Sequence, residues 1–272
     1  MGAIYALMAL GMVILLRSLN LFNFVQGETV MGGAFLGVLF YMVLKLPFWA
    51  SFGLALVLMA LLGAVVERLA INPLKNPTVN SMITATIAAG VILQNVGLIL
   101  GGPEPLILNS PVQNLKLTIG NQTIPLHSLL IIGTAILLMV LLQCFFHFTK
   151  AGICIRAVMA DRQAAQMMGV RVSRMITLTF AISSALGAAS GVLVGPVIYV
   201  AFDMGFIAMK SFAAAIAGGM YSFFGAVVAG FCLGVLETLL SAYVSSAYRD
   251  VITYALIIAV LLVRPQGLFV RK

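Results

Sequence analysis

Two carboxylates within apolar runs are the side chains of this chain best placed to do chemistry. Glu28 follows the sequence NFVQ, and Glu237 lies inside another run, in GVLETLL. An ionisable side chain at membrane depth is costly to bury and marks a functional site by default. Either carboxylate could bind the ammonium group of a substrate or, in a gradient-driven carrier, a proton. The structural alternative is a carboxylate near lipid headgroups or in a hydrogen bond between helices.

Neutral polar side chains accompany these carboxylates in or beside the apolar runs. Asn23 and Gln26 precede Glu28 in LNLFNFVQGE, and Gln94 and Asn95 interrupt a later run. With Glu28, Asn23 and Gln26 are candidates for the lining of a translocation path. Hydrogen bonding between membrane helices explains such residues equally well, so both interpretations stay open.

The sequence lacks the spacing patterns typical of enzymes and metal sites. It contains no HExxH, no GxSxG and no GxxxxGK[ST], so we expect no catalytic residue, no metal and no ATP bound by this chain itself. An unusual intramembrane hydrolase is the remaining enzymatic alternative. His127 and His147 have no companion at metal or acid/base spacing, and we expect both at the membrane interface. Without CxxC spacing, the cysteines are expected to be buried thiols: Cys144, Cys154 and Cys232.

The composition predicts an all-α, polytopic integral membrane protein. Of 272 residues, 62% are hydrophobic and 8% are charged, against roughly 25% charged residues in a soluble domain. A membrane helix needs about 20 apolar residues, and such runs recur along the whole chain, which we take as one transmembrane domain, 1–272. We expect about 8–9 membrane segments, some short or broken. The runs are 2–16, 27–44, 48–66, 79–100, 126–148, 175–200, 208–220, 222–242 and 250–263.

The net charge of +8 is interpreted as a topology signal, with no nucleic acid partner, because the cations flank apolar runs. Lys and Arg favour the cytoplasmic side, which places the loop 149–174 inside and the stretch 101–126 outside. The same rule puts further cations inside: Arg68, Lys75, Arg264, Arg271 and Lys272. The sequence TIGNQTIPL predicts a small hairpin around Gly120 and Asn121. Counting crossings from the basic loop then puts the amino terminus outside, where a few further residues are expected to precede Met1.

A glycine-rich stretch, SFAAAIAGGMYSFFGAVVAGFCLG, predicts broken or short helices over 208–242. Crossing parity requires two crossings or none there, and the stretch is too short for two full helices. Gly218 and Gly219 are the expected point of the break, beside the translocation path. Irregular backbone at membrane depth is tolerated only against protein or a water-filled cavity. Tight helix packing through small residues is the other interpretation.

The basic loop 149–174 carries five of the fifteen Lys and Arg residues. Asp161 is a plausible N-cap and Gly169 a plausible residue after the helix end, so the spacing predicts a helix over 162–168. Its Ala164, Met167 and Met168 share one face at i, i+3 and i+4. Such a face suits docking into a groove of a partner; an incidental helix in a topological anchor is the alternative.

The segment QAAQMMG resembles the EAA-type loop of ABC-importer permeases, with Gln163 where Glu is usual. Several blocks resemble, in order, the high-affinity branched-chain amino acid transport permeases: GAIYALMALGMVIL, LNLFNFVQGETVMGGAF, ERLAINPLKNP, ILQNVGLILGGPEP, AGICIRAVMADRQAAQMMGV, KSFAAAIAGGMYSFFGAVVAGFCLGVLET and YRDVITYALIIAVLLVRPQGLF. The sequence departs from that family at Gln26, where His is frequent in NFAHGE, and at MYSFF, where LGSIP is frequent.

The resemblance implies a type II ABC-importer-like permease in a bacterial or archaeal plasma (inner) membrane. It implies as partners two cytoplasmic ATP-binding subunits, a second homologous permease subunit, an extracytoplasmic solute-binding protein and membrane lipid. ATP would be bound by the partners, and this chain would need no cofactor. The residues implied in coupling are Arg156, Asp161, Arg162, Gln163, Ala164, Ala165, Met168 and Gly169.

Several alternatives stay open from the sequence. A self-sufficient secondary carrier or channel for a small polar solute competes with the ATP-driven permease subunit. The substrate is a branched-chain amino acid, another small amino acid, an amide or urea, and the permease pair is homodimeric or heterodimeric.

Overall fold

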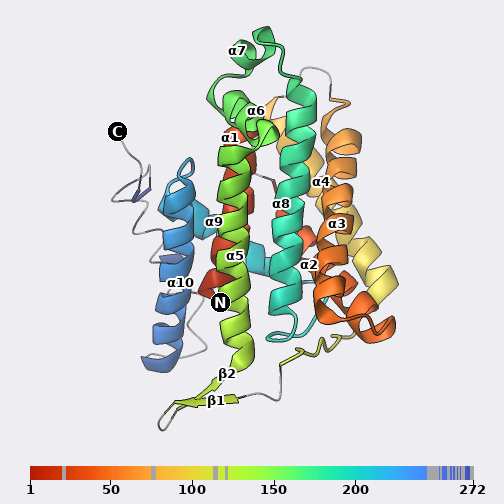
Figure 1. Ribbon diagram of the computed structural model, residues 1–272, viewed down its shortest axis with the longest axis vertical. Helices are drawn as coiled ribbons and strands as arrows, with labels where there is room; N and C mark the ends of the chain where they lie inside the picture. Colours follow the sequence, from red (N-terminus) through yellow and green to blue (C-terminus); the bar gives the residue numbers. More distant parts are fainter. Residues whose placement is uncertain are drawn as a thin grey trace.

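The chain forms a helical bundle with a small β-hairpin at one end (Figure 1). A computed structural model describes residues 1–19, 23–74, 78–112, 116–119 and 122–243, and single residues from 251 to 269. The hairpin and the short helix α7 lie at opposite ends of the bundle. These ends are called the hairpin end and the loop end below.

Six helical stretches among the described residues are long and apolar enough to cross a membrane. They are α1 (Gly2–Leu19), α3 (Phe48–Val66) continued by the π-helical η2 (Glu67–Ile71), α4 (Val79–Gly101), α5 (Leu126–Phe148), α8 (Val172–Val194) and α10 (Phe223–Tyr243). Two other apolar stretches are α2 (Gln26–Gly37), continued by the π-helical η1 (Val38–Val43), and the short α9 (Phe206–Gly218). The expected polytopic α-helical architecture is confirmed, while the count of 8–9 segments stays a prediction.

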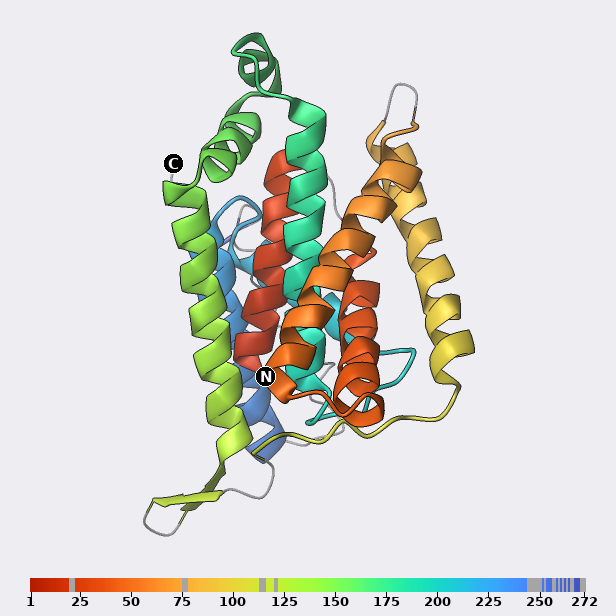
Figure 2. The same ribbon diagram turned by 45° about the vertical axis from the view of Figure 1, so that its right-hand side comes forward.

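The core of the bundle is built on α1 and α8. In α1, 89% of the 18-residue window is buried, whereas in α4 and α5 the fractions are 11% and 22%. Small residues permit close packing, because a Cβ added at Gly33 would lie 2.3 Å from the Cα of Ala188, and one at Gly191 would lie 2.0 Å from the carbonyl oxygen of Val30. Helix α2 is therefore fixed against α8 by backbone contact. Figure 2 shows α4 at the edge of the bundle.

The expected helix over 175–200 is wrong at its carboxyl end. Helix α8 ends at Val194, and Gly195 after it still has helical dihedral angles. The helix stops there because Pro196 lacks the N–H that the next helical hydrogen bond needs. The chain then turns back, and Val200 pairs with Leu106 as an isolated antiparallel bridge.

The stretch 208–242 differs from the expectation in one respect. It holds one short helix, the 13-residue α9, but also a full-length one, the 21-residue α10. Two full helices do not fit, as expected, yet the glycines break only the first. Of the expected segment 250–263, half of the residues lie outside the described ones.

The predicted hairpin is confirmed by the pairing of β1 (Lys116–Ile119) with β2 (Gln122–Pro125), in which Ile119 faces Gln122. Its turn residues, Gly120 and Asn121, lie outside the described part of the chain.

The expectation of buried cysteines is wrong. Cys144 and Cys232 are exposed and Cys154 is intermediate, because they lie on outward faces of apolar helices, which the sequence alone does not distinguish from inward ones. His127 is buried, with Nδ1 2.8 Å from the Ser110 hydroxyl and Nε2 3.2 Å from the carbonyl oxygen of Leu193. It joins the first turn of α5 to the end of α8.

Candidate functional site

Helix α2 begins inside the bundle, at the level of the centres of α1 and α8. The Gln26 side chain donates to the carbonyl oxygen of Ser183 (3.2 Å) and accepts from the Ser183 hydroxyl (2.7 Å). That hydroxyl also lies 2.8 Å from the carbonyl oxygen of Gly11. Gly11 and Ser183 stand near the middle of their helices, so Gln26 ties the start of α2 to the middle of the bundle.

Helix α9 begins at the same place. A Cβ added at Gly27 would lie 2.9 Å from the carbonyl oxygen of Gly205, the residue before α9. The first turns of α2 and α9 therefore meet, backbone against backbone, inside the bundle. Each helix amino terminus carries a partial positive charge, so the meeting point favours a negative group.

Glu28 supplies that negative group. A Cβ added at Gly205 would lie 2.9 Å from its Oε1, and its buried Oε2 has no hydrogen-bond partner among the described residues. The side chain also borders a groove of about 340 Å³ between α2, α3 and α4, lined otherwise by apolar residues and glycines. An unpaired carboxylate beside an open groove can bind an ammonium group.

Asn23 lies just before α2 and is 1% exposed. Its Oδ1 accepts from the backbone N–H of Val25 at 3.2 Å, while its Nδ2 has no partner among the described residues. Asn23, Gln26 and Glu28 thus all lie at or just before the first turn of α2, and their role in lining a translocation path stays a prediction.

Glu237 belongs to a separate, paired cluster. Its Oε2 accepts from the Tyr5 hydroxyl at 2.7 Å, and its Oε1 forms an ion pair with Lys210 of α9. The carboxylate is 3% exposed. Glu237 is engaged in linking α1, α9 and α10, which matches the structural alternative given for it above.

Gly218 and Gly219 lie at the far end of α9 from Glu28. A Cβ added at Gly218 would lie 2.3 Å from the carbonyl oxygen of Gly225 in α10, and Gly219 has a φ of 106°. Both glycines are required by the close turn between the two helices. The break in regular backbone that borders Glu28 is at Gly205, not at Gly218 and Gly219.

The predicted helix of the basic loop is present as α7 (Arg162–Met167), preceded by α6 (Lys150–Ala160). The Asp161 carboxylate accepts from the backbone N–H groups of Gln163 (2.8 Å) and Ala164 (3.0 Å). Gly169 has a φ of +84°, the left-handed conformation expected of a residue that ends a helix. Both predicted ends of the helix are confirmed to within a residue.

Helix α7 has one side packed against the rest of the protein and one side exposed. Met167 and Met168 are 82% and 86% exposed, and Ala164 is also exposed, whereas Ala165 is 5% exposed. Gln163 and Arg156 are exposed as well. Ala165 therefore packs inward, while the outward side of α7 presents two methionines and an alanine beside glutamine side chains.

Arg162 joins α7 to the core. Its Nε donates to the carbonyl oxygen of Ser18 at 2.9 Å, and its second guanidinium nitrogen bonds to the same oxygen. Ser18 lies in the last turn of α1, where unpaired carbonyl groups attract cations. Partial burial lowers the pKa of the Arg162 guanidinium, which stays charged because its ordinary value is so high.

Sequence reasoning missed Ser183, Gly205 and Lys210. Lys210 interrupts an apolar stretch just as Glu237 does, so the argument applied to the carboxylates would have found it. Ser183 and Gly205 carry no comparable signal, because their roles depend on contacts with α2. No three His, Cys, Asp or Glu side chains among the described residues are grouped to hold a metal ion.

Comparison with known proteins gives full-length matches. Residues 1–261 match the family described as the branched-chain amino acid transport system / permease component. The chain is 32% identical, over its whole length and 92% of the relative, to the high-affinity branched-chain amino acid transport system permease protein LivH of Escherichia coli K12.

Two further relatives come from another bacterium and an archaeon. BraD of Pseudomonas aeruginosa, a protein of the same description, is 28% identical, covering 99% of this chain and 92% of the relative. A probable branched-chain amino acid transport permease protein of Methanocaldococcus jannaschii is 30% identical, covering 96% and 87%. No solved structure matches. With six candidate membrane spans, this chain is a multi-pass membrane protein, and it belongs to the branched-chain amino acid transport permease family.

Proposed function

We propose that this chain is the membrane-spanning permease subunit of an ATP-driven importer. Its cargo would be branched-chain amino acids or related small amino acids and amides, delivered by an extracytoplasmic solute-binding protein. The names of the full-length relatives support the transport class. The observation that carries the ATP-driven mechanism is α7, a short exposed helix outside the candidate spans that ends in two exposed methionines.

Helix α7 is the proposed contact with the cytoplasmic ATP-binding subunits. Two exposed methionines, Met167 and Met168, offer a flexible apolar surface that fits a groove in a cytoplasmic ATP-binding subunit. Two such subunits and a second permease subunit would complete the transporter, with ATP bound by the partners and no cofactor in this chain. The loop 149–174 would be cytoplasmic and 101–126 extracytoplasmic, because the cations gather in the first.

Motion of α7 has a physical route into the bundle. Arg162 holds the last turn of α1 through the carbonyl oxygen of Ser18. Helix α1 in turn carries the Gly11 carbonyl group that accepts from Ser183, which is bonded to Gln26. A displacement of α7 would thus reach the meeting point of α2 and α9, where Glu28 is proposed to contact the ammonium group of the cargo.

Reconstitution of the complete transporter tests the proposal. Gly169→Val changes the backbone preference by about 1–2 kcal/mol without a steric clash, since nothing lies within 4 Å of the added Cβ. We expect ATP hydrolysis stimulated by the binding protein to fall severalfold or more, and Met168→Glu to act likewise. Gly133→Val is the matched control, because that glycine also has open space. Wild-type stimulation in both loop variants, or uptake by this chain alone in liposomes, would favour the secondary carrier.

A further inference from the structure

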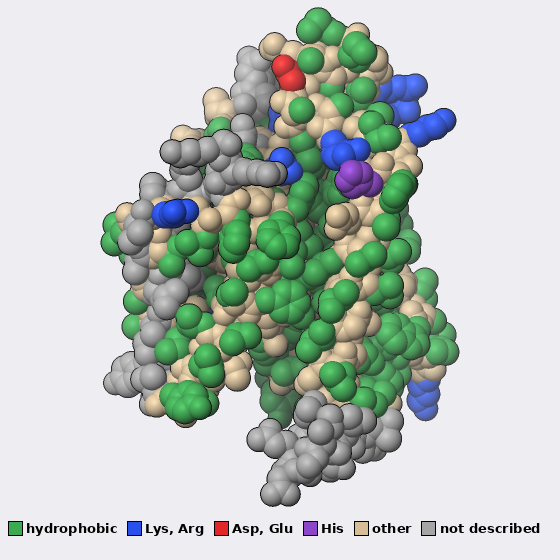
Figure 3. Space-filling model, turned by 60° about the vertical axis from the view of Figure 1, so that its left-hand side comes forward, with side chains coloured by type: hydrophobic (Ala, Val, Ile, Leu, Met, Phe, Trp, Pro, Cys, Tyr) green, Lys and Arg blue, Asp and Glu red, His purple; other side chains and the backbone are tan. Residues whose placement is uncertain are grey.

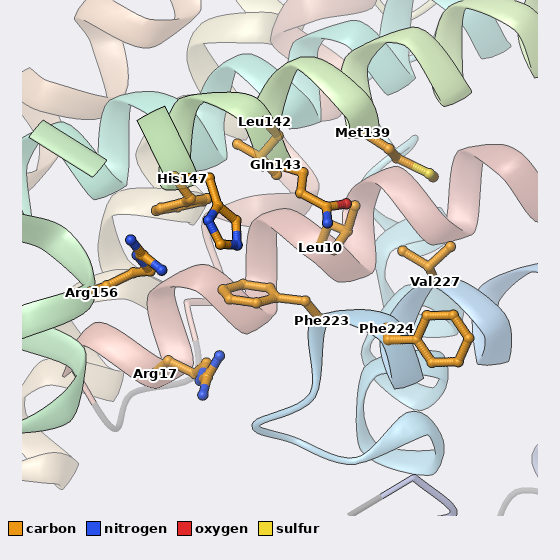
Figure 4. Close-up of a pocket in the computed structure, with 11 residues that line it drawn as sticks. Leu10, Arg17, Met139, Leu142, Gln143, His147, Arg156, Phe223, Phe224 and Val227 are labelled. Carbon is orange, nitrogen blue, oxygen red and sulfur yellow. The ribbon is translucent and has the colours of Figure 1, made fainter. Parts of the chain in front are cut away.

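A groove between α1, α5 and α10 changes in chemistry along its length. It encloses about 420 Å³ and is drawn in Figure 4. One part is lined by Arg17, Arg156, His147 and Gln143, and the other by apolar side chains that include Leu10 and Met139. The groove is thus amphipathic.

The polar part lies at the level of the helix ends and the apolar part near the bundle centre. Arg17 is in the last turn of α1 and His147 in the last turn of α5. Leu10 and Met139 stand near the middles of the same helices. At 1.5 Å per residue, these pairs are separated by about 10–12 Å along the helix axes. The groove therefore runs from headgroup depth into the hydrocarbon core.

Among the described residues, no Asp or Glu lines this groove. Asp161 lines a neighbouring cavity that Arg17 also borders, but its carboxylate caps α7. The ion pair found among the described residues joins Lys210 to Glu237 elsewhere. The Arg17 guanidinium lies 4.8 Å above the ring of Phe223, which holds the charge in place without neutralising it. Figure 3 shows Lys, Arg and His side chains gathered toward the loop end above a mainly hydrophobic face.

The groove exists because α5 and α10 both pack against α1 and make few contacts with each other. The stacked rings of Phe146 and Phe223, with centroids 5.7 Å apart, bridge them near the loop end. On the side of this bridge away from the loop end, apolar side chains line the space between the two helices.

We propose that this groove binds one anionic phospholipid. The phosphate lies between Arg17 and Arg156, where guanidinium groups form charge-assisted hydrogen bonds to its oxygens, and an acyl chain follows Leu10 and Met139 into the apolar part. Basic pockets between membrane helices on the cytoplasmic side bind such headgroups. A soluble anion would leave the apolar part empty, and a second copy of this chain docked by the same face would set its cations against these.

The inference requires only that the chain spans a membrane, so its test needs no partner subunits. The protein is purified in mild detergent, and bound lipid is measured by native mass spectrometry after exchange with phosphatidylglycerol or phosphatidylcholine. We expect selective retention of phosphatidylglycerol. The double variant Arg17→Gln/Arg156→Gln is expected to reduce retention at least severalfold. The matched control is Arg171→Gln/Arg174→Gln. It removes two exposed cations that lie outside the groove, in the basic loop that also holds Arg156.

A second variant tests the apolar half without altering charge. Val227→Phe places a larger side chain in the groove. We expect it to lower phosphatidylglycerol retention severalfold, independently of the result for the arginine variants. Equal retention of phosphatidylcholine, or an equal loss in the control, would overturn the proposal. So would full competition by soluble glycerol phosphate, which would identify a site for a free anion, or unchanged retention in Val227→Phe.

Discussion

Gly27 and Gly205 touch backbone to backbone where the first turns of α2 and α9 meet. At Gly27 an added Cβ would lie 2.9 Å from the carbonyl oxygen of Gly205, so alanine there forces the two backbones apart. At Gly205 an added Cβ would lie 2.9 Å from Oε1 of Glu28, so alanine there displaces that carboxylate. Overpacking of this kind costs about 1–3 kcal/mol. We expect Gly27→Ala and Gly205→Ala to insert normally but to lower uptake severalfold or more in the assembled transporter. Gly133→Ala, in open space, should transport at the wild-type rate; similar uptake in all three variants would contradict the expectation.

Glu28 should matter for transport and not for stability. One of its carboxylate oxygens is buried without a partner, so Glu28→Gln removes a charge and leaves no group newly unpaired. We expect the apparent Tm of the variant in detergent to stay the same or rise, while uptake falls strongly. Glu104→Gln, an exposed carboxylate near the hairpin end, is the control for loss of one negative charge. A lower Tm with unchanged uptake would make Glu28 a structural residue.

Glu237 should show the opposite behaviour. Removing one partner of a buried ion pair typically costs about 3–5 kcal/mol, because the other charge is left uncompensated. We expect Lys210→Met to lower the apparent Tm markedly and the double variant Lys210→Met/Glu237→Gln to recover much of the loss. The amide oxygen of Gln can still accept from the Tyr5 hydroxyl. Strictly additive effects in a double-mutant cycle would show that the pair is not coupled.

The two ends of the bundle should label from opposite sides of the membrane. Asn109, near the hairpin end, and Gln163, in α7, are both exposed. In a background with the three native cysteines replaced by serine, we expect Asn109→Cys to react with an impermeant thiol reagent applied to intact cells. Gln163→Cys should react only after permeabilisation. Labelling of Gln163→Cys in intact cells, with Asn109→Cys labelled only after permeabilisation, would show that the membrane topology inferred from the Lys and Arg residues is inverted.

Local signals in the sequence predicted local features well. Asp161 and Gly169 fixed the ends of α7 because capping depends on the residue type at one position. The hairpin was predictable for the same reason. The end of α8 was missed although Pro196 marks it, because hydrophobicity continues through Val200 and outweighed the proline.

Contacts between segments that are distant in the chain could not be predicted from the sequence. Glu28 and Glu237 look alike as single acids in apolar runs. Yet a buried oxygen of Glu28 has no hydrogen-bond partner among the described residues, whereas Glu237 is paired with Lys210. That difference is set by how α9 crosses between α2 and α10. Likewise, the glycine that borders Glu28 is Gly205, which stands alone in its stretch, and not the conspicuous pair Gly218 and Gly219.

The burial of α1 also has a consequence for synthesis in the cell. This first helix is the most enclosed of the candidate spans, and it packs chiefly against α10, α8 and α9. Its main neighbour, α10, begins at Phe223, more than two hundred residues later. At about 5–20 residues per second, a ribosome makes α10 roughly 10–40 s after α1 has left it. During that interval the partner for one face of α1 has not yet been made, so the order of translation, more than the strength of any contact, sets how long the nascent chain is open to wrong helix pairing.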